Sequence, residues 1–453
     1  MYEEEEQDVR PGAELGDIFD GAKWRLSPYV RMLPCPQGEL RLRNMASGAV
    51  VTLSESEASA LRPALLFGAA EQPLPAVGEE LIAGEFLVPI EIDSPAVAMA
   101  RYIRFSTRPE TSVAILTSVR SARRVAPIEP WVLDALTEWV KRTADEGRGI
   151  SVSWLGDNPF KSSRSISWAS ARWRHACDER GVKFAAGVRG PVRSCSRGAL
   201  ADLAHGGVER FELMVRPPFE RAAELVAVLL GGQERSLAVT LSVFGDDAAR
   251  CGGDLAALVA GLPDGVAVRT VPRPRRRAAQ GRGALCGGCT ATATVLAQGG
   301  DSDRIRLGGF AQPFGSMCHA ADANTFVVGP SGLLHKCTVA LDEPMNVVGS
   351  LQANGVVAMM DDRLAAWTQP WGLHQRECRR CHFLLACYGN ACPLHRIMSG
   401  QRPCPDLKDA VDHLDETPNS PTLSVPCDPL AGCRTVPGHY LRQTPTRRWN
   451  GGY

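Results

Sequence analysis

Two cysteine-rich stretches lie in the C-terminal third of the chain: CHAADANTFVVGPSGLLHKC at 318–337 and CRRCHFLLACYGNACPLHRIMSGQRPC at 378–404. Together with Cys286-Gly-Gly-Cys289 they contain nine cysteines. Thiolates at such short spacings, in a chain without an export signal, favour soft-metal ligation over disulfides. Four thiolates hold one iron–sulfur cluster, so this number suffices for two. The C-terminal third is therefore predicted to bind metal.

The overall composition excludes several classes of partner. The 453 residues include 50 Lys and Arg against 50 Asp and Glu, which gives zero formal net charge and no general affinity for nucleic acid or anionic membranes. The N-terminal segment MYEEEEQD is acidic, unlike a secretory or transit segment, and we find no apolar run of about 18 residues. Fifteen cysteines in such a chain indicate a reducing compartment. We therefore expect a cytoplasmic protein.

The N-terminal part reads as a small separate unit. Residues 1–28 are expected to be a disordered acidic segment, and residues 29–92 follow as the unit itself. Its expected elements are a hairpin of Leu40–Asn44 and Ala49–Leu53, a helix opened by a capping box of Ser54 and Glu57, a helix around Glu79–Ala83, and a strand within Gly84–Pro89. This order resembles a winged-helix fold.

Residues 93–272 alternate short apolar strands with amphipathic helices. The expected strands are Tyr102–Ser106, Ile150–Leu155, Lys183–Gly187, Arg210–Val215, Leu237–Val243 and Val266–Val271. The expected helices are Trp131–Lys141, Ser165–Arg180, Pro218–Leu230 and Asp254–Ala260. Such alternation makes a parallel sheet. The predicted fold class is thus α/β, a partial (β/α)6 TIM-type barrel with an N-terminal winged-helix-like domain and a C-terminal cysteine-rich module.

The remaining segments complete the expected domain division. Residues 273–285 form a basic linker whose Arg273–Arg282 run is either a solvated connector or a docking surface for an acidic partner. Residues 286–410 form the cysteine-rich module, and residues 411–453 form a tail with little fixed structure.

The cysteine spacing resembles the SPASM extension of radical S-adenosylmethionine (radical SAM) enzymes. That extension has a Cys, a Gly-x4-Cys, a Cys-x2-Cys-x5-Cys group followed shortly by another Cys, and a distant last Cys. Here the order is Cys318, Gly332-x4-Cys337, Cys378-x2-Cys381-x5-Cys387, Cys392 and Cys404. One departure is the four residues between Cys387 and Cys392, where three are usual.

The resemblance implies two auxiliary 4Fe–4S clusters. Cys318, Cys337 and Cys392 would ligate the first, with the fourth ligand from Cys286, Cys289 or a histidine of the module. Cys378, Cys381, Cys387 and Cys404 would ligate the second. Two Cys-x2-Cys pairs could instead build structural zinc sites, and Cys286-Gly-Gly-Cys289 could be a redox pair. The isolated cysteines are expected to be buried apolar residues: Cys35, Cys177, Cys195 and Cys251.

The catalytic motif of the radical SAM family is missing. In that family a Cys-x3-Cys-x2-Cys loop follows the first barrel strand and binds the cluster that holds S-adenosylmethionine. After the expected strand Tyr102–Ser106, the three ligand places fall at Glu110, Ala114 and Thr117. No cysteine stands between Cys35 and Cys177, and hard or inert side chains cannot replace three soft thiolates.

A second motif of the family is also incomplete in this chain. The family's Gly-Gly-Glu-Pro segment at the end of the second strand corresponds to Gly156-Asp157-Asn158-Pro159 here, which lacks the Glu. The resemblance therefore implies a degenerate barrel, and we expect no S-adenosylmethionine as cofactor.

The N-terminal unit also resembles the small recognition domain of ribosomal peptide maturation systems. In that family the precursor's leader peptide adds as a strand to an exposed sheet edge. The predicted contact residues are Arg41, Leu42, Arg43 and Asn44. An ordinary winged-helix scaffold is the alternative. DNA binding is disfavoured because acidic and basic residues balance in this unit.

The leading hypothesis is a partner subunit with no radical chemistry of its own, and therefore not an enzyme by itself. It would bind a precursor peptide and an active radical SAM enzyme in the maturation of ribosomally made peptides. The alternatives are an active peptide-modifying radical SAM enzyme with unusual cofactor ligation, or a zinc-stabilised interaction protein.

Overall fold

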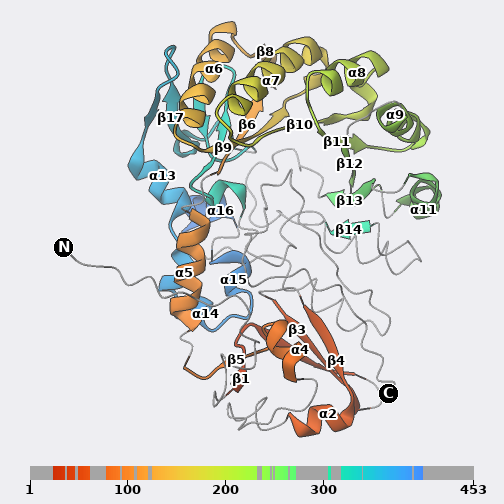
Figure 1. Ribbon diagram of the computed structural model, residues 1–453, viewed down its shortest axis with the longest axis vertical. Coiled ribbons are helices and arrows are strands. Elements are labelled where there is room, and N and C mark those ends of the chain that lie inside the picture. The colour runs from red at the N-terminus through yellow and green to blue at the C-terminus, as the bar shows by residue number, and fades with distance from the viewer. Residues whose placement is uncertain are drawn as a thin grey trace.

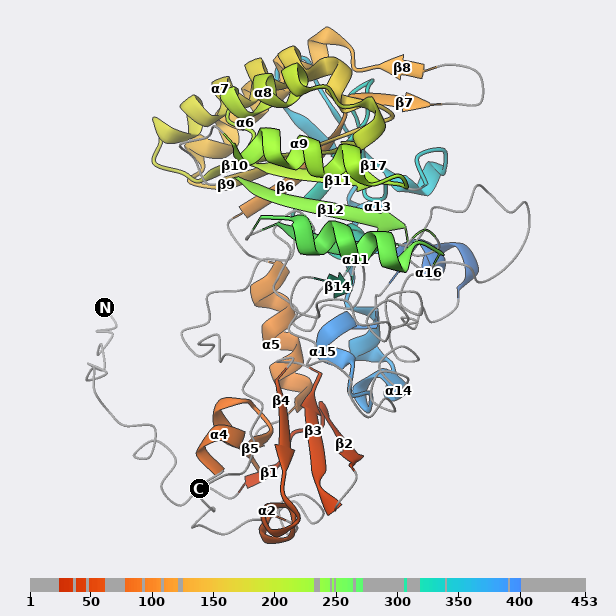
Figure 2. The same cartoon turned by 90° about the vertical axis from the view of Figure 1, so that its right-hand side faces the viewer.

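The computed structural model describes residues 24–400 apart from 36–37, 46–48, 62–77, 92–93, 107–109, 121–124, 232–236, 245–246, 248–249, 264–265, 272–304, 308–317, 339 and 390–391. Figures 1 and 2 show the N-terminal unit at one end of the molecule and a large sheet at the other, with α5, α14 and α15 between them. Among the described residues, no helix is long and apolar enough to cross a membrane. The expected basic linker and C-terminal tail lie outside these residues.

The N-terminal unit contains the elements expected from the sequence, together with two further strands. β2 (Val30–Pro34), β3 (Leu40–Asn44) and β4 (Val50–Leu53) form an antiparallel sheet, and β1 (Trp24–Leu26) pairs with β5 (Leu87–Pro89). Helix α2 (Glu55–Ala60) begins with the predicted capping box, and α4 spans Gly78–Ala83. Trp24 is fully buried in the unit's own apolar core. The expected disorder of residues 1–28 is therefore wrong from Trp24 onward, because this segment adds a strand to the unit.

The large sheet has eleven strands among the described residues, in the order β14-β13-β12-β11-β10-β9-β6-β15-β16-β17-β18. The strands from β14 to β15 in this order are parallel, and β16–β18 continue antiparallel. The parallel strands are β6 (Glu110–Leu116), β9 (Gly149–Leu155), β10 (Phe184–Pro191), β11 (Arg210–Val215), β12 (Ala238–Phe244), β13 (Ala267–Val271), β14 (Ile305–Leu307) and β15 (Thr325–Val328). The prediction of a mixed α/β fold with a mainly parallel sheet is confirmed.

The first strand of this sheet was placed wrongly by the sequence. Tyr102–Ser106 belongs to helix α5 (Ser94–Ser106), and the first parallel strand is β6. Ala98 and Tyr102 are four residues apart and buried, whereas Ile103 is exposed, which is the pattern of a helix with one apolar face. The short alternation Tyr-Ile-Arg-Phe-Ser fits a strand locally, but packing against the C-terminal module selects the helix.

Helices cover one face of the parallel strands (Figure 2). They are α6 (Pro130–Asp145), α7 (Ser163–Asp178), α8 (Arg197–His205), α9 (Glu220–Leu230) and α11 (Gly252–Gly261). Their apolar residues join alternate strand residues in one large core. Inside this core the Trp154 and Trp173 rings stack with centroids 5.3 Å apart. Helix α8 was not expected from the sequence.

Two turns of the C-terminal hairpins pack on α6. They lie between β15 and β16 (Leu333–His335), and between β17 (Val347–Leu351) and β18 (Val357–Met359). Gly332 has φ +79°, and a Cβ there would stand 2.6 Å from the Trp131 ring. Gly355 has φ +76°, and a Cβ there would stand 2.6 Å from the Trp139 backbone nitrogen in α6. Arg142 donates to the Asn354 carbonyl (3.3 Å). Only glycine fits these two turns, because the backbone is left-handed and the helix is in contact.

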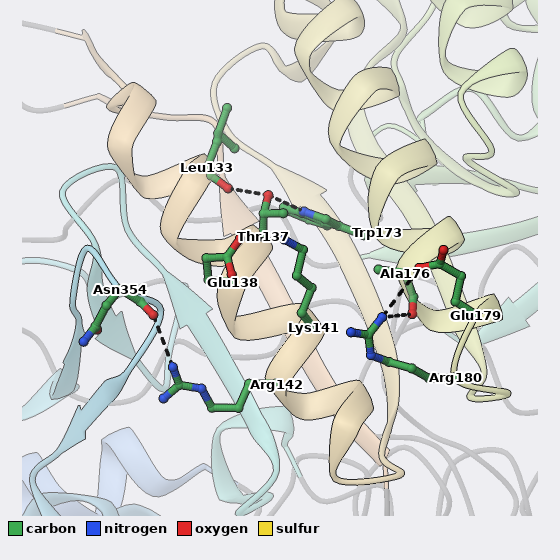
Figure 3. Close-up of polar contacts among 10 residues, drawn as sticks. All are labelled: Leu133, Thr137, Glu138, Lys141, Arg142, Trp173, Ala176, Glu179, Arg180 and Asn354. Carbon is green, nitrogen blue, oxygen red and sulfur yellow. Dashed lines mark hydrogen bonds and ion pairs between the residues drawn. The ribbon is translucent and has the colours of Figure 1, made fainter.

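Figure 3 shows α6 joined on its other side to α7. The Thr137 hydroxyl donates to the Leu133 carbonyl and accepts from the Trp173 ring N–H, both at 2.9 Å. Arg180 donates to the Ala176 carbonyl at the end of α7 (3.0 Å). Helix α6 therefore contacts helix α7 on one side and the turns of the two C-terminal hairpins on the other.

The last described elements are short. They are α13 (Asp361–Thr368), α14 (Arg376–Arg379), α15 (Leu384–Cys387) and α16 (Pro393–Ser399), with short 3-10 turns at η4 (His319–Ala321), η5 (Pro344–Asn346) and η6 (Trp371–His374). A third apolar cluster joins α14 and α15 to α5 and to Tyr29 of the N-terminal unit.

Candidate functional site

The three cysteines of the first predicted set lie in three separate segments. Cys318 precedes η4, Cys337 follows β16, and Cys392 precedes α16. The pKa of the Cys318 thiol is raised to about 12, mainly by burial and further by the nearby Cys337 and Cys392 thiols. Burial also raises the pKa of Cys392. Cys337 and Cys392 are thus near enough in the fold to act electrostatically on Cys318.

Asn346 fixes the backbone that carries Cys337. Its buried side-chain oxygen accepts from the Lys336 and Cys337 N–H groups at 3.0 and 2.8 Å. Its side-chain nitrogen donates to the carbonyls of Cys337 and Ala340 at 2.8 and 2.9 Å. One amide therefore bonds to four backbone groups, of which the Lys336 N–H and the Ala340 carbonyl also have a backbone partner. Sequence reasoning missed this residue, since an isolated Asn carries no periodic signal.

Lys336 lies fully buried beside Cys337. Its ammonium donates to the carbonyls of Asp322 (2.5 Å) and Thr325, and it stands 4.9 Å from the centre of the Phe326 ring. The Asp322 carboxylate accepts from the Thr325 hydroxyl at 2.6 Å. A buried cation next to thiols favours their ionised form, and the charge of Lys336 indeed opposes the burial effect on the pKa of Cys318.

Two histidines lie next to this cysteine set. Nε2 of His319 and Nδ1 of His335 are buried and have no hydrogen-bond partner among the described residues. Burial, and then the charges of Lys336 and Arg189, lower the pKa of His319 to about 4, and burial lowers that of His335. Both rings are therefore neutral near pH 7, the form in which an imidazole nitrogen can bind a metal.

The second cysteine set lies on the short helices. Cys378 lies in α14, Cys381 follows it, and Cys387 ends α15. Cys378 is buried in the third apolar cluster. Gly389 has φ +67°, and a Cβ there would stand 3.2 Å from the Cys378 sulfur. Cys404, Cys286 and Cys289 lie outside the described residues.

The donor set suits an iron–sulfur cluster chemically, because soft thiolates are its ligands. Among the described residues, no three His, Cys, Asp or Glu side chains lie close enough to hold a metal ion. The thiols at Cys318, Cys337 and Cys392 would be the protein ligands of the first cluster, and those at Cys378 and Cys381 would belong to the second. A bound cluster would supply electron-transfer capacity and crosslink these segments.

The segment compared with the second family motif, Gly156–Pro159, follows the second parallel strand and lies against the carboxyl end of the first. Thr117 follows β6 and donates through its hydroxyl to the Leu155 carbonyl (2.9 Å). Gly156 has φ +143°, and a Cβ there would stand 2.6 Å from the Thr117 hydroxyl. Asp157 is exposed, and Asn158 and Pro159 lead into the 3-10 turn η2 (Pro159–Ser162). The predicted position of this segment after the second strand is confirmed.

The positions given to the first motif need correction. Glu110 and Ala114 lie within β6, and Glu110 is at the amino end of the strand. The segment that follows the first strand is instead 117–129, with the sequence TSVRSARRVAPIE, and it includes the antiparallel strands β7 (Ser118–Arg120) and β8 (Val125–Pro127). This segment also contains no cysteine. The expected ligand positions therefore move to this segment. The conclusion that they supply no thiol stays the same.

The face of the sheet opposite the helices carries a polar network that sequence reasoning missed. Arg189 on β10 pairs with the buried Glu212 on β11 at 3.0 Å, and Ser242 on β12 donates to the same carboxylate at 2.8 Å. Arg210 donates to the Ser151 hydroxyl at 2.8 Å. Strand alternation could have indicated this face, since polar residues here occupy every second position.

A cavity of about 380 Å³ lies at the carboxyl ends of β11 and β12. It is lined by Arg216, Pro217, Asp247, Arg250 and Cys251. The buried Asp247 carboxylate forms an ion pair with Arg250. Ligands of open parallel sheets bind at such strand ends.

The isolated cysteines Cys177 and Cys195 are core residues, as expected. Both are buried in the large apolar core. Burial raises their pKa values to about 11 and about 12. Unlike Cys318, neither thiol has another cysteine among the groups that shift its pKa.

The predicted peptide-contact residues lie on β3, which is the central strand of its sheet. β3 is paired on both sides, with β2 and with β4, so its backbone cannot accept a further strand. Leu42 is fully buried, and Asn44 donates to the carbonyls of Gly84 and Glu85 at 3.1 and 2.7 Å. Arg43 is buried as well, and Arg41 lies between the two neighbouring strands. The sequence pattern predicted only the two strands of the hairpin. The third strand, which makes β3 central, is formed by residues 30–34.

No protein-family model and no curated protein sequence matches this chain. It is similar to solved structures of native anSMEcpe with bound AdoMet (11% identity, 66% of this chain, 94% of that chain, TM-score 0.49) and of BtrN in complex with AdoMet and 2-DOIA (9%, 64%, 91%, 0.31). It is also similar to coproporphyrinogen III oxidase (HemN) from Escherichia coli, described as a radical SAM enzyme (16% identity, 40% of this chain, 48% of that chain, TM-score 0.26). These similarities are low, so the chemistry of the site rests on the chain's own residues.

Proposed function

We propose that this chain is a degenerate member of the radical SAM/SPASM group that generates no radical itself. It acts as the partner subunit of an active radical SAM enzyme in the maturation of a ribosomally made peptide, in the cytoplasm. The observation that supports this proposal most directly is that the segment after the first parallel strand, residues 117–129, contains no cysteine. Three thiolates are the minimum that would hold a cluster there with one iron open.

The other cysteines do not supply the missing loop. Cys177 and Cys195 are buried in the apolar core, and no other cysteine is among the groups that shift their pKa values. Cys35 belongs to the N-terminal unit, directly after β2. These placements support a partner role over an active enzyme with unusual ligation.

The cysteine module supports the assignment of two auxiliary 4Fe–4S clusters. The electrostatic influence of Cys337 and Cys392 on Cys318 supports one ligand set taken over from the SPASM resemblance. Two complete clusters give about eight iron atoms per chain. Replacing Cys378 and Cys381 with Ser should remove about half of this iron, whereas stoichiometric zinc without acid-labile sulfide would contradict the cluster assignment.

The N-terminal unit supplies the peptide site in this proposal. A leader peptide would add as a strand to an outer edge of the β2-β3-β4 sheet, since β3 is paired on both sides. Amide hydrogen exchange of the full chain, with and without the precursor peptide, should slow along β2 or along β4. Unchanged exchange along both strands would remove the peptide site from this unit.

The decisive test is reductive cleavage of S-adenosylmethionine by the anaerobically purified chain. We expect no 5′-deoxyadenosine above the blank from this chain alone. We expect peptide modification when the chain is combined with its radical SAM partner, and poor modification when the chain is omitted. Cleavage by the isolated chain would refute the proposal.

A further inference from the structure

The third apolar cluster joins three parts of the chain that are far apart in sequence. It contains Tyr29 of the N-terminal unit, Ala98 and Tyr102 of α5, and residues of the cysteine module: Ala321, Leu373, Cys378, Leu384, Leu385 and Tyr388. In Figure 2 the helices α14 and α15 lie beside α5 and above the N-terminal sheet. One ligand of the second cysteine set is thus a core residue of this junction.

Directional contacts reinforce the junction. The Tyr102 and Tyr388 rings meet edge to face, with centroids 5.5 Å apart, and the Tyr102 hydroxyl donates to the Thr368 carbonyl. Nδ1 of His382, the residue directly after Cys381, is 2.7 Å from the Pro28 carbonyl. The turn before β2 therefore rests on the segment that carries Cys378 and Cys381.

Helix α5 ties the junction to the rest of the N-terminal unit. Arg101 donates to both carboxylate oxygens of Glu85 at 2.9 Å. Such two-point pairs hold orientation as well as charge. The N-terminal unit thus contacts the module directly through the turn and indirectly through α5.

The module's side of this junction has little secondary structure to hold it. Helices α14 and α15 each have four residues, far fewer than an isolated helix needs. Tyr388 is left-handed at φ 49°, and the Gly372 N–H bonds to the Tyr388 carbonyl at 2.9 Å. Ligation by several thiolates is the kind of crosslink that orders such a segment, because metal binding and folding are coupled.

We propose that metal loading of the set containing Cys378 and Cys381 controls the docking of the N-terminal unit, and through it the presentation of the bound peptide. With metal bound, residues 371–389 form the ordered surface on which Tyr29 and the turn at Pro28 pack. Without metal this surface loses its order, and the N-terminal unit detaches from it. This inference rests on the proposed function for the metal and the peptide.

The first experiment is amide hydrogen exchange on the full, metal-loaded chain. A Cys378→Ser/Cys381→Ser variant should speed exchange in residues 24–34 by about tenfold or more, because the surface that buries Tyr29 loses its order. The matched control, Cys318→Ser/Cys337→Ser, removes the other cluster and should leave this exchange unchanged. Equal effects of both variants, or no effect of the first, would overturn the coupling.

The second experiment leaves every cysteine intact. Coupling is reciprocal, so Tyr29→Ala should release metal to a chelator about tenfold faster from one of the two sites. Met32→Ala, on the exposed side of β2 and outside the cluster, is the control and should release metal at the parent rate. Equal release rates for Tyr29→Ala and Met32→Ala would also overturn the inference.

Metal analysis separates this inference from the proposed function. Iron and sulfide present without coupling refute the inference and leave the proposed function standing. Coupling with zinc in place of iron refutes the cluster assignment and leaves the inference standing. A chain that binds neither metal refutes both.

Discussion

Asn346→Ala tests whether one amide holds the Cys337 ligand. The side chain is fully buried and makes four hydrogen bonds, two to backbone N–H groups and two to carbonyls. Each such bond contributes about 0.5–1.5 kcal/mol net. Alanine removes all four, and water entering the cavity restores part of the bonding. We expect the local opening free energy around Cys337 to fall by about 3 kcal/mol.

The assay is amide hydrogen exchange at Lys336 and Cys337, whose N–H groups bond directly to Asn346. A loss of about 3 kcal/mol corresponds to exchange roughly 100-fold faster. The iron bound at the first cluster should fall in parallel, because Cys337 is one of its proposed ligands. The control is Asn354→Ala, which removes one exposed turn bond to the Val356 N–H and should change these two amides by no more than about threefold. Unchanged exchange at Lys336 and Cys337 in Asn346→Ala would refute the role of Asn346.

Three further predictions follow from single contacts. Gly332→Ala should destabilise the fold by about 2 kcal/mol or more, because the left-handed backbone and the Trp131 ring both oppose a Cβ; Gly147→Ala, also left-handed but with open space, should cost only about 1 kcal/mol in denaturant unfolding. Because the folded pKa of His319 is about 4 and the unfolded value about 6.5, its stabilising contribution is complete above pH 6.5 and is lost as pH falls toward 4; a His319→Gln chain should show a shallower loss over this window. Cys177 should resist alkylation at pH 8 until the chain unfolds, since its pKa is raised to about 11.

Local sequence patterns determined the elements that depend on their own residues. Ser54 and Glu57 predicted the start of α2, because a capping box satisfies helix N–H groups within four residues. The strands from β9 to β13 followed from apolar runs between helical segments. The lack of thiols in the segment after the first strand is likewise a property of the sequence alone, and it survived the move of that strand from Tyr102–Ser106 to β6.

Tertiary structure decided everything that depends on distant partners. Residues 102–106 became helix because Ala98 and Tyr102 pack against a module nearly 300 residues away, and β3 became a central strand because residues 30–34 pair with it. The four bonds of Asn346 and the junction at Tyr29 have no signature in spacing. Periodicity reports which face of an element is apolar, whereas the identity of the surface that covers this face is set only when the whole chain packs.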